Sequence, residues 1–597
     1  MEQKHRTSVT LSTSPRKLTL PGKILAVCLC ILPFLTRSLT VEIPQAVRSA
    51  YFLGDGGYSD FEQLFREFFL LGIAAAGVIW FFYEQIALRP KRKLPMTRLT
   101  AVVFILLGLY LLLGLLSTIT SEYATESWLG IYMLYEGYLA LVGYVVVFAA
   151  AWYWIDRKEV LDFVKSCLTV LSIVLGVLAL LERSGICYYN SAIVQFLGGL
   201  QGTVGVGDAV SLTFGNADYL GMYCAMLLPV VVSLITREGT TKRLLVQILA
   251  AVLLATALLL SKVMNAILLG FGLTVVFLLI WAFHTNWKPI VKGCLCGVTA
   301  AAVVFGSVGF LWSRSGDTLS EKFRHTMIGM AQEETFRILS IDLNGNTVSI
   351  KNANTTFSVA TAGNNLTPQE LTCNGTEVIP QIDADGMTCS FAEPELKHCQ
   401  VQVQFDRLDF LMGYATPLEV VRQDGSWLAL GVGQTPLTEV PEVSSSKSLQ
   451  QCYPYLNGRV FVWANTISAL RDCWILGHGP ATTIFYLNQY DLPALLNIFG
   501  VYALYNKPHN WYLQVAQDTG IPSMLLILGV LVLFFVCGFR KCFGKQEKWD
   551  AFRTGLLLSV LSYALMAFFN DSLIYHAPMF WFLLGIGWRQ MTVGTEE

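Results

Sequence analysis

The feature that most constrains this chain is a succession of long apolar stretches separated by short polar ones. A helix needs about 20 mainly apolar residues to cross a bilayer, because no backbone polar group can stay unpaired in hydrocarbon. About twelve candidate spans of this kind lie near Ile24–Leu39, Phe65–Phe82, Leu99–Ile119, Leu129–Ile155, Val160–Leu181, Leu212–Ile235, Leu244–Leu260, Val263–Phe283, Ile290–Trp312, Ile521–Phe539, Gly555–Phe569 and Met579–Trp588. Only 14% of the 597 residues are charged and 54% are hydrophobic, which excludes a string of soluble domains. The net charge of -1 gives no reason to expect a nucleic-acid partner.

Basic residues predict the orientation of these spans. Lys and Arg gather in connections such as Arg89–Arg98, whereas connections on the opposite side, such as Ser121–Glu126, are acidic. Cytoplasmic loops carry the excess of Lys and Arg, so both termini are expected in the cytoplasm. The expected domains are an N-terminal transmembrane bundle of about nine helices at 1–312, a large extracytoplasmic loop at 313–506, and C-terminal transmembrane helices at 507–597.

The large loop carries patterns of its own. Phe336–Ile350 and Leu418–Leu430 each alternate apolar and polar residues around a central Asn-Gly or Asp-Gly pair, the strongest short signal for a β-hairpin. These patterns predict a small inserted β module at about 335–440. Helical spacing returns at Arg459–Ile475, which predicts an amphipathic helix at about 459–475, near the membrane surface.

The passage most informative about chemistry is Lys507–Gly520, with the sequence KPHNWYLQVAQDTG. His509 follows a proline, which places it at a helix start, where free N–H groups favour anions. An imidazole can take a proton from an attacking hydroxyl near neutral pH. His509 is therefore a candidate general base, with Asn510 beside it. The alternative interpretation is an interfacial histidine in a helix cap.

A second passage runs from Arg459 to Pro480. Arg459 and Trp463 are one helical turn apart and share a face, and a Gly-His-Gly-Pro run ends the helix. Arginine offers a planar fork of donors that suits phosphate. A solvated surface arginine is the alternative.

Three further positions draw attention in the apolar stretches. Lys262 lies between two apolar runs, where a cation costs about 2.5–3.5 kcal/mol and so indicates function first; the alternative is that it reaches out to the interface. Asn216 and Asp218 enter the sixth predicted span from outside, in the sequence TFGNADYLG. Glu136 lies in the fourth predicted span, where it is either functional or a buried carboxyl bonded to a tyrosine.

Together these passages resemble the O-antigen ligase/polymerase family of bacterial membrane glycosyltransferases. The matching pieces are TFGNADYLG, LLLSK before Val263, the Arg459–Trp463 helix with its GHGP ending, and HNxxL…G at His509. The resemblance covers about Leu212–Phe539 without the β module. This chain has Lys262 where the family usually has arginine, and it lacks the basic residue often found just before TFGN.

The resemblance implies transfer of a glycan from an undecaprenyl-diphosphate carrier to an acceptor hydroxyl, which belongs to a glycan, a lipid or another molecule, at the outer face of the bacterial cytoplasmic (inner) membrane. It implies an all-α polytopic membrane protein with a GT-C-like arrangement of about 12 transmembrane helices and an extracytoplasmic β module. His509 would activate the acceptor, Arg459 and Lys262 would bind the diphosphate, and Asn510, Trp463, Asn216 and Asp218 would support them. No cofactor and no metal is expected, since no acidic cluster of Asp-x-Asp type accompanies these cations at the outer interface.

Three alternatives stay open at this point. A polymerase breaks the same carrier bond as a ligase, and only the acceptor differs. A twelve-span transporter predicts related halves and broken helices. A sensor or envelope-assembly protein would use the β module to bind a partner. The enzyme hypothesis requires His509, Arg459 and Lys262 to meet in one outer cavity.

Overall fold

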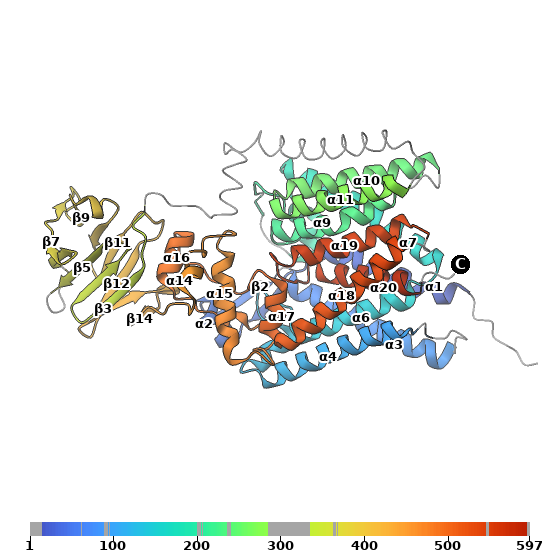
Figure 1. Cartoon of the computed structure of the whole chain (residues 1–597), viewed down its shortest axis with the longest axis horizontal. Coiled ribbons are helices and arrows are strands. Elements are labelled where there is room, and N and C mark those ends of the chain that lie inside the picture. The colour runs from blue at the N-terminus through green and yellow to red at the C-terminus, as the bar shows by residue number, and fades with distance from the viewer. Residues whose placement is uncertain are drawn as a thin grey trace, which may run out of the picture.

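A computed structural model describes residues 15–60, 62–88, 94, 96–199, 204–205, 207–235, 240–284, 335–361, 366, 368–544 and 548–593. These residues form a helical bundle and, at one end of it, a β module joined to the bundle by short helices (Figure 1). The end of the chain lies at the far end of the bundle, away from the β module (Figure 1).

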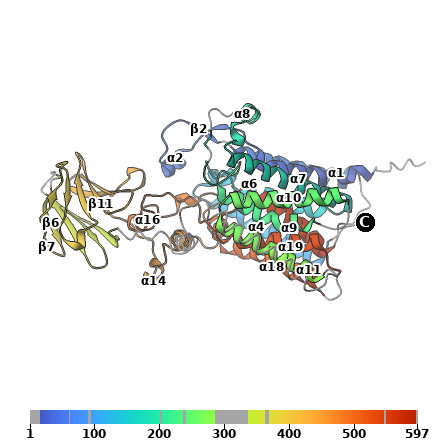
Figure 2. The ribbon, with the colours of Figure 1, turned by 90° about the horizontal axis from the view of Figure 1, so that it is seen from above.

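The helices of the bundle are α1 (Pro15–Ile31), α3 (Gln63–Tyr83), α4 (Arg98–Thr120), α6 (Tyr138–Trp154), α7 (Lys158–Arg183), α9 (Ala217–Ser233), α10 (Thr241–Leu260), α11 (Met264–His284), α18 (Ile521–Phe543), α19 (Ala551–Met566) and α20 (Ala577–Thr592). The shorter helices are α2 (Gln45–Tyr51), α5 (Ala124–Leu129), α8 (Ala192–Gly198), α14 (Lys447–Gln450), α15 (Arg459–Ala469), α16 (Leu492–Phe499) and α17 (Trp511–Thr519). From above, the long helices of the bundle run roughly side by side (Figure 2).

Six helices in the described part of the chain are long and apolar enough to cross a membrane, and they lie at Gln63–Ala87, Arg98–Thr120, Lys158–Arg183, Thr241–Leu260, Met264–His284 and Ile521–Phe543. Four other predicted spans are shorter apolar helices, at Thr19–Phe34, Tyr138–Trp154, Ala217–Ser233 and Ala551–Met566. The last predicted span corresponds to α20. The span predicted near Ile290–Trp312 lies outside the described residues.

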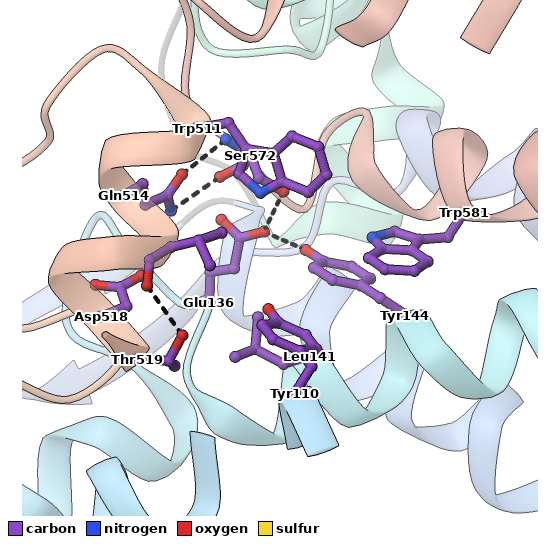
Figure 3. A pocket seen from close by; sticks show the side chains of 11 residues that line it. Tyr110, Glu136, Leu141, Tyr144, Trp511, Gln514, Asp518, Thr519, Ser572 and Trp581 are labelled. Atoms are coloured by element: carbon purple, nitrogen blue, oxygen red, sulfur yellow. Dashed lines mark hydrogen bonds between the residues drawn. The ribbon is translucent and has the colours of Figure 1, made fainter. Parts of the chain in front are cut away.

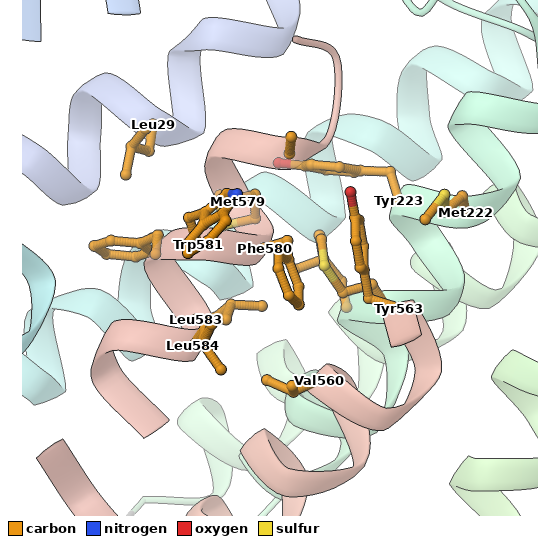
Figure 4. Packing of buried hydrophobic residues seen from close by; sticks show 14 of the residues in the cluster. Leu29, Met222, Tyr223, Val560, Tyr563, Met579, Phe580, Trp581, Leu583 and Leu584 are labelled. Carbon is orange, nitrogen blue, oxygen red and sulfur yellow. The ribbon is translucent and has the colours of Figure 1, made fainter. Parts of the chain in front are cut away.

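Helices α9 and α20 occupy the middle of the bundle. Every residue of α20 from Ala577 to Met591 is buried, and so is every residue of α9 from Leu220 to Ser233. Side chains from four helices interlock there (Figure 4), namely Leu29 of α1, Met222 and Tyr223 of α9, Val560 and Tyr563 of α19, and Met579, Phe580, Trp581, Leu583 and Leu584 of α20. Helices α9 and α20 therefore pack against other parts of the protein along almost their whole length.

One predicted span is wrong at its start. Helix α6 begins at Tyr138 rather than near Leu129, because the chain first makes α5 and then a tight loop. Gly130 has φ +93°, and a side chain on Gly137 would come within 2.5 Å of the Gly130 nitrogen. Two backbone segments thus meet where only glycine fits. Glu136 therefore lies in this loop and not inside a membrane span.

The β module consists of two antiparallel sheets, with the strand orders β3-β4-β5-β6-β7 and β14-β13-β12-β11-β10-β9-β8. The strands of the first sheet are β3 (Ser340–Asn344), β4 (Thr347–Lys351), β5 (Thr356–Thr361), β6 (Pro368–Cys373) and β7 (Thr376–Glu377). Those of the second are β8 (Gln381–Ile382), β9 (Thr388–Ser390), β10 (Gln400–Val403), β11 (Arg407–Leu411), β12 (Leu418–Gln423), β13 (Ser426–Leu430) and β14 (Pro436–Leu437). A third, two-stranded sheet pairs β1 (Leu39–Glu42) with β2 (Gly57–Asp60).

Both predicted hairpins are present, as the pairs β3–β4 and β12–β13. The two large sheets share one apolar core, in which the Phe357 and Phe410 rings, one from each sheet, lie 6.3 Å apart. Leu492 and Leu496 of α16 belong to the same core. The β module is thereby anchored to the segment that leads into α17.

Candidate functional site

The His509 motif forms a helix start, as the sequence predicts. Asn510 caps α17, and its side-chain oxygen accepts a hydrogen bond from the Leu513 N–H at 3.1 Å. His509 precedes the cap with a left-handed backbone (φ +51°), which non-glycine residues adopt rarely. Such backbone positions cluster at functional sites.

The Asp571 carboxylate, which no sequence motif predicted, contacts this histidine. His509 Nδ1 is 3.1 Å from Asp571 Oδ2, and Asp571 Oδ1 accepts a hydrogen bond from the Asn510 N–H at 3.2 Å. Asp571 comes from the loop between α19 and α20 and is fully buried, whereas the His509 side chain is 39% exposed. One edge of the imidazole thus contacts a fixed carboxylate, and the rest of the ring is accessible.

Charges around Asp571 keep it ionised. Burial alone raises the pKa of this carboxyl, but His509, Lys507 and the Asn510 N–H outweigh it and lower the pKa below its usual value. Lys507 is itself buried, and burial lowers its pKa against the opposing pull of Asp571 and Glu136. A histidine beside an ionised carboxylate can act as a general base, since the carboxylate stabilises the imidazolium that forms.

Arg459, the predicted phosphate ligand, lies beside the start of α9. Arg459 is the first residue of α15, and its Nη2 is 3.6 Å from Asp218 Oδ2, in the first turn of α9. Asn216 caps α9 by accepting a hydrogen bond from the Asp218 N–H at 3.0 Å. Tyr219, the residue after Asp218, faces Lys507, and the Lys507 Nζ is 5.7 Å from the centre of the Tyr219 ring.

The first turn of α9 therefore brings the two motifs together. Arg459 contacts it through Asp218, and the His509 segment contacts it through Lys507 and Tyr219. Tyr219 also stacks on Tyr575, in the same loop as Asp571, with ring centres 5.6 Å apart. Trp463, which the sequence predicts as a supporting residue, lies half-buried one turn further along α15.

Lys262 lies in a different group of charges. It occupies the turn between α10 and α11 with φ +58° and forms an ion pair with Asp208, whose other carboxylate oxygen is 3.5 Å from Arg183 Nη1. The turn still adjoins α9, because a side chain on Gly221 would meet Val263 at 3.0 Å. Lys262 thus lies beside the helix that carries Asp218 but has Asp208 as its own partner.

The GHGP turn has a structural role. The His478 and Gly479 N–H groups donate to the carbonyls of Gln517 and Asp518, at 2.8 and 3.0 Å. A side chain on Gly520 would come within 1.9 Å of the Ile475 oxygen. The backbone at Gly520, at the end of the His509 motif, therefore packs directly on the backbone just before the GHGP turn. The His478 ring stacks on Tyr486 with ring centres 3.8 Å apart, and its Nε2 lies 3.0 Å from the Ala469 carbonyl oxygen.

A small cavity is lined in part by Ser572, the residue that follows Asp571 (Figure 3). Its lining includes Glu136, Asp518, Ser572, Tyr110 and Tyr144. Tyr144 donates a hydrogen bond to Glu136 Oε1 at 2.5 Å, so Glu136 is a buried carboxyl bonded to a tyrosine. The enclosed space of about 10 Å³ is enough for about one water molecule.

These features define an integral membrane protein with a carboxylate-supported histidine and an arginine at one end of its helical bundle. A family model described as O-antigen ligase matches residues 427–528, which include Arg459, Lys507 and His509. This match confirms the resemblance to the O-antigen ligase/polymerase family and supports a glycan-transferring role in cell-surface polysaccharide assembly. No curated protein matches the chain.

Proposed function

We propose that this protein transfers a glycan from an undecaprenyl-diphosphate carrier to an acceptor hydroxyl at the outer face of the bacterial inner membrane. The observation that carries the proposal is the contact between His509 and Asp571, 3.1 Å apart. His509 lies within the segment that matches the ligase family, and Asp571 comes from a later part of the chain. We further propose that the shorter apolar helices also span, that both termini are cytoplasmic, and that the β module is extracytoplasmic.

In this reaction the acceptor oxygen bonds to the anomeric carbon while the bond from that carbon to the carrier phosphate oxygen breaks. His509 takes the acceptor proton, and Asp571 stabilises the imidazolium that results. The carrier diphosphate leaves with added negative charge. Arg459, which is only 18% exposed and also contacts Asp218, stabilises that charge with the guanidinium donors that Asp218 leaves open.

Lys262 is the second cation of the proposal. Lys262 forms an ion pair with Asp208, which also contacts Arg183. Lys262 therefore binds phosphate only when its ion pair with Asp208 opens or when Asp208 pairs with Arg183 instead. Lysine also lacks the bidentate geometry of arginine. Arg459 is therefore the main ligand for the diphosphate. No step of the proposal requires a metal ion, and transfer should continue in the presence of a chelator.

The test is reconstitution of the purified protein in vesicles that contain a glycan linked to polyprenyl diphosphate. Wild-type protein should release free carrier diphosphate and form a new glycosidic product, and His509→Ala should do neither. His398→Ala, a half-buried histidine of the β module, is the matched control and should retain activity. A transporter would move the intact lipid without releasing carrier diphosphate, and that result would reject the proposal.

A further inference from the structure

The loop that carries Asp571 is attached to α17 at several points. The Trp511 N–H donates to the carbonyls of Ala567 and Asn570, at 2.8 and 3.0 Å. The Gln514 side chain holds both backbone groups of Ser572, accepting from its N–H at 2.8 Å and donating to its carbonyl at 3.3 Å. Ser572 directly follows Asp571, so these bonds fix the carboxylate that contacts His509.

Glu136 adds a third attachment, from a distant part of the chain. Its Oε1 accepts hydrogen bonds from Tyr144 at 2.5 Å and from the Ser572 hydroxyl at 3.3 Å. The residue is 3% exposed, and its Oε2 has no hydrogen-bond partner among the described residues. Asp518 Oδ1 is likewise buried and without a partner there, and both residues line the cavity in Figure 3.

The surroundings of Glu136 favour its neutral form. Burial raises the pKa of Glu136 to about 8, against the opposing effects of the Tyr144 hydroxyl and Lys507. Burial and the charge of Asp571 also raise the pKa of Asp518. The titratable groups around Glu136 come from several elements and include Tyr144 from α6, Asp518 from α17, Lys507 from the loop before α17, Glu67 from α3, Tyr110 from α4, Tyr219 from α9 and Tyr563 from α19. A neutral carboxyl avoids repulsion among these acidic neighbours.

We propose that Glu136 is a positioning residue for glycan transfer: through Ser572 it holds Asp571 at the distance and angle that orient His509. The inference rests on the proposed function, and it assigns a role to a residue that lies outside the segment matched by the ligase family. Glu136 acts here through its shape and its acceptor oxygen, and its charge is not required.

This role predicts opposite results for two substitutions. Glu136→Gln keeps the size and the acceptor oxygen, so its kcat should stay close to that of wild type. Glu136→Ala removes the acceptor of the Ser572 hydroxyl and leaves space beside it, so the Asp571 loop can shift although Gln514 still holds the Ser572 backbone. The kcat should fall by up to about 10²-fold, the effect of a displacement of about 1 Å. The KM for the lipid-linked donor should stay unchanged in both variants. The exposed Glu377→Gln in β7 is the matched control.

A double-mutant cycle separates positioning from general destabilisation. If Glu136 acts through Asp571, Glu136→Ala should have no further effect on kcat in an Asp571→Asn background. Additive losses in the double variant would overturn the inference, and so would inactivity of Glu136→Gln, since that result would mean that the charge is needed.

A second readout does not depend on transfer. The measurement is the rate at which diethyl pyrocarbonate modifies His509, read by mass spectrometry on the full-length protein. Relative to wild type, this rate should change in the same direction and to the same extent in Glu136→Ala and in Asp571→Asn. Glu136→Gln should match wild type. If wild-type protein transfers no glycan, the proposed function fails, and this readout still decides the positioning role. Equal reactivity in Glu136→Ala and wild type would reject that role.

Discussion

The contact between His509 and Asp571 predicts a large effect of Asp571→Asn on the chemical step. Asparagine keeps the shape of the side chain, and its carbonyl oxygen can still accept the hydrogen bond from the Asn510 N–H. The substitution removes the negative charge that faces the imidazole. It also brings an amide N–H group toward the ring nitrogen, which favours the wrong tautomer.

The magnitude follows from the 3.1 Å separation of the His509 and Asp571 side chains. At an effective dielectric constant of about 20, two unit charges at that distance interact by about 5 kcal/mol. Because the histidine is 39% exposed, solvent screening reduces this value, and about 3 kcal/mol is a reasonable working figure. That loss is about 10²-fold in kcat, and a wrong tautomer extends it toward about 10⁴-fold.

The assay is release of carrier diphosphate by protein reconstituted with the lipid-linked glycan, with kcat and KM measured separately. Asp571→Asn should lower kcat and leave the KM for the donor unchanged, since Arg459 is untouched. The matched control is Asp424→Asn at an exposed hairpin turn with φ +52°, a position where asparagine is well tolerated. A folded Asp571→Asn protein with wild-type kcat would refute the role of the carboxylate.

Three further predictions use the same assay. Arg459→Ala should lower activity by about 10²–10³-fold because a donor to the developing charge is lost, and Arg459→Lys should retain part of the activity. The matched control is Arg471→Ala, at an exposed arginine in the turn that follows α15, and it should be neutral. Lys262→Ala should lose less than Arg459→Ala, by about tenfold at most, because lysine lacks the bidentate geometry of arginine and Lys262 lies apart from the place where the Arg459 and His509 segments meet. Equal losses would contradict this ranking. Deletion of residues 340–440, with the Leu492 and Leu496 side chains that this deletion uncovers made polar, should change the preferred acceptor while carrier cleavage continues. Loss of cleavage in a folded deletion variant would contradict it.

The sequence predicts the local structure of the motifs well, because short-range rules determine it. The proline-preceded His509 and the cap at Asn510 begin α17, and the Asn-Gly and Asp-Gly pairs form their hairpins. The likeness to the ligase family is confirmed by the match to residues 427–528. Each of these features depends on residues within a few positions of one another.

The partners of the motifs depend on tertiary packing and could not be predicted in this way. Asp571 reaches His509 from a loop between two helices, at a position that carries no recognisable pattern. Lys507 stands in the motif itself, but only the fold shows that it is buried against Tyr219 and Asp571. Glu136 lies before α6 and not within the predicted span, because Gly130 and Gly137 approach each other closely and form a loop there. Hydropathy does not detect such a contact.

The convergence of the three predicted residues is only partly visible in the fold. Arg459 and the His509 segment meet at the first turn of α9, whereas Lys262 pairs with Asp208 beside the same helix. Hydropathy and motif spacing gave Lys262 no partner, because Asp208 precedes it by 54 residues and lies in a connection without a motif. A salt bridge between distant loops is a property of the packed bundle.

The most direct measurement compares wild-type protein and His509→Ala for release of free carrier diphosphate from a lipid-linked glycan in sealed vesicles. Wild-type protein should release the diphosphate and form the new glycosidic bond, and His509→Ala should bind the donor yet release none. Release by His509→Ala at the wild-type rate would contradict the role of the histidine in glycan transfer.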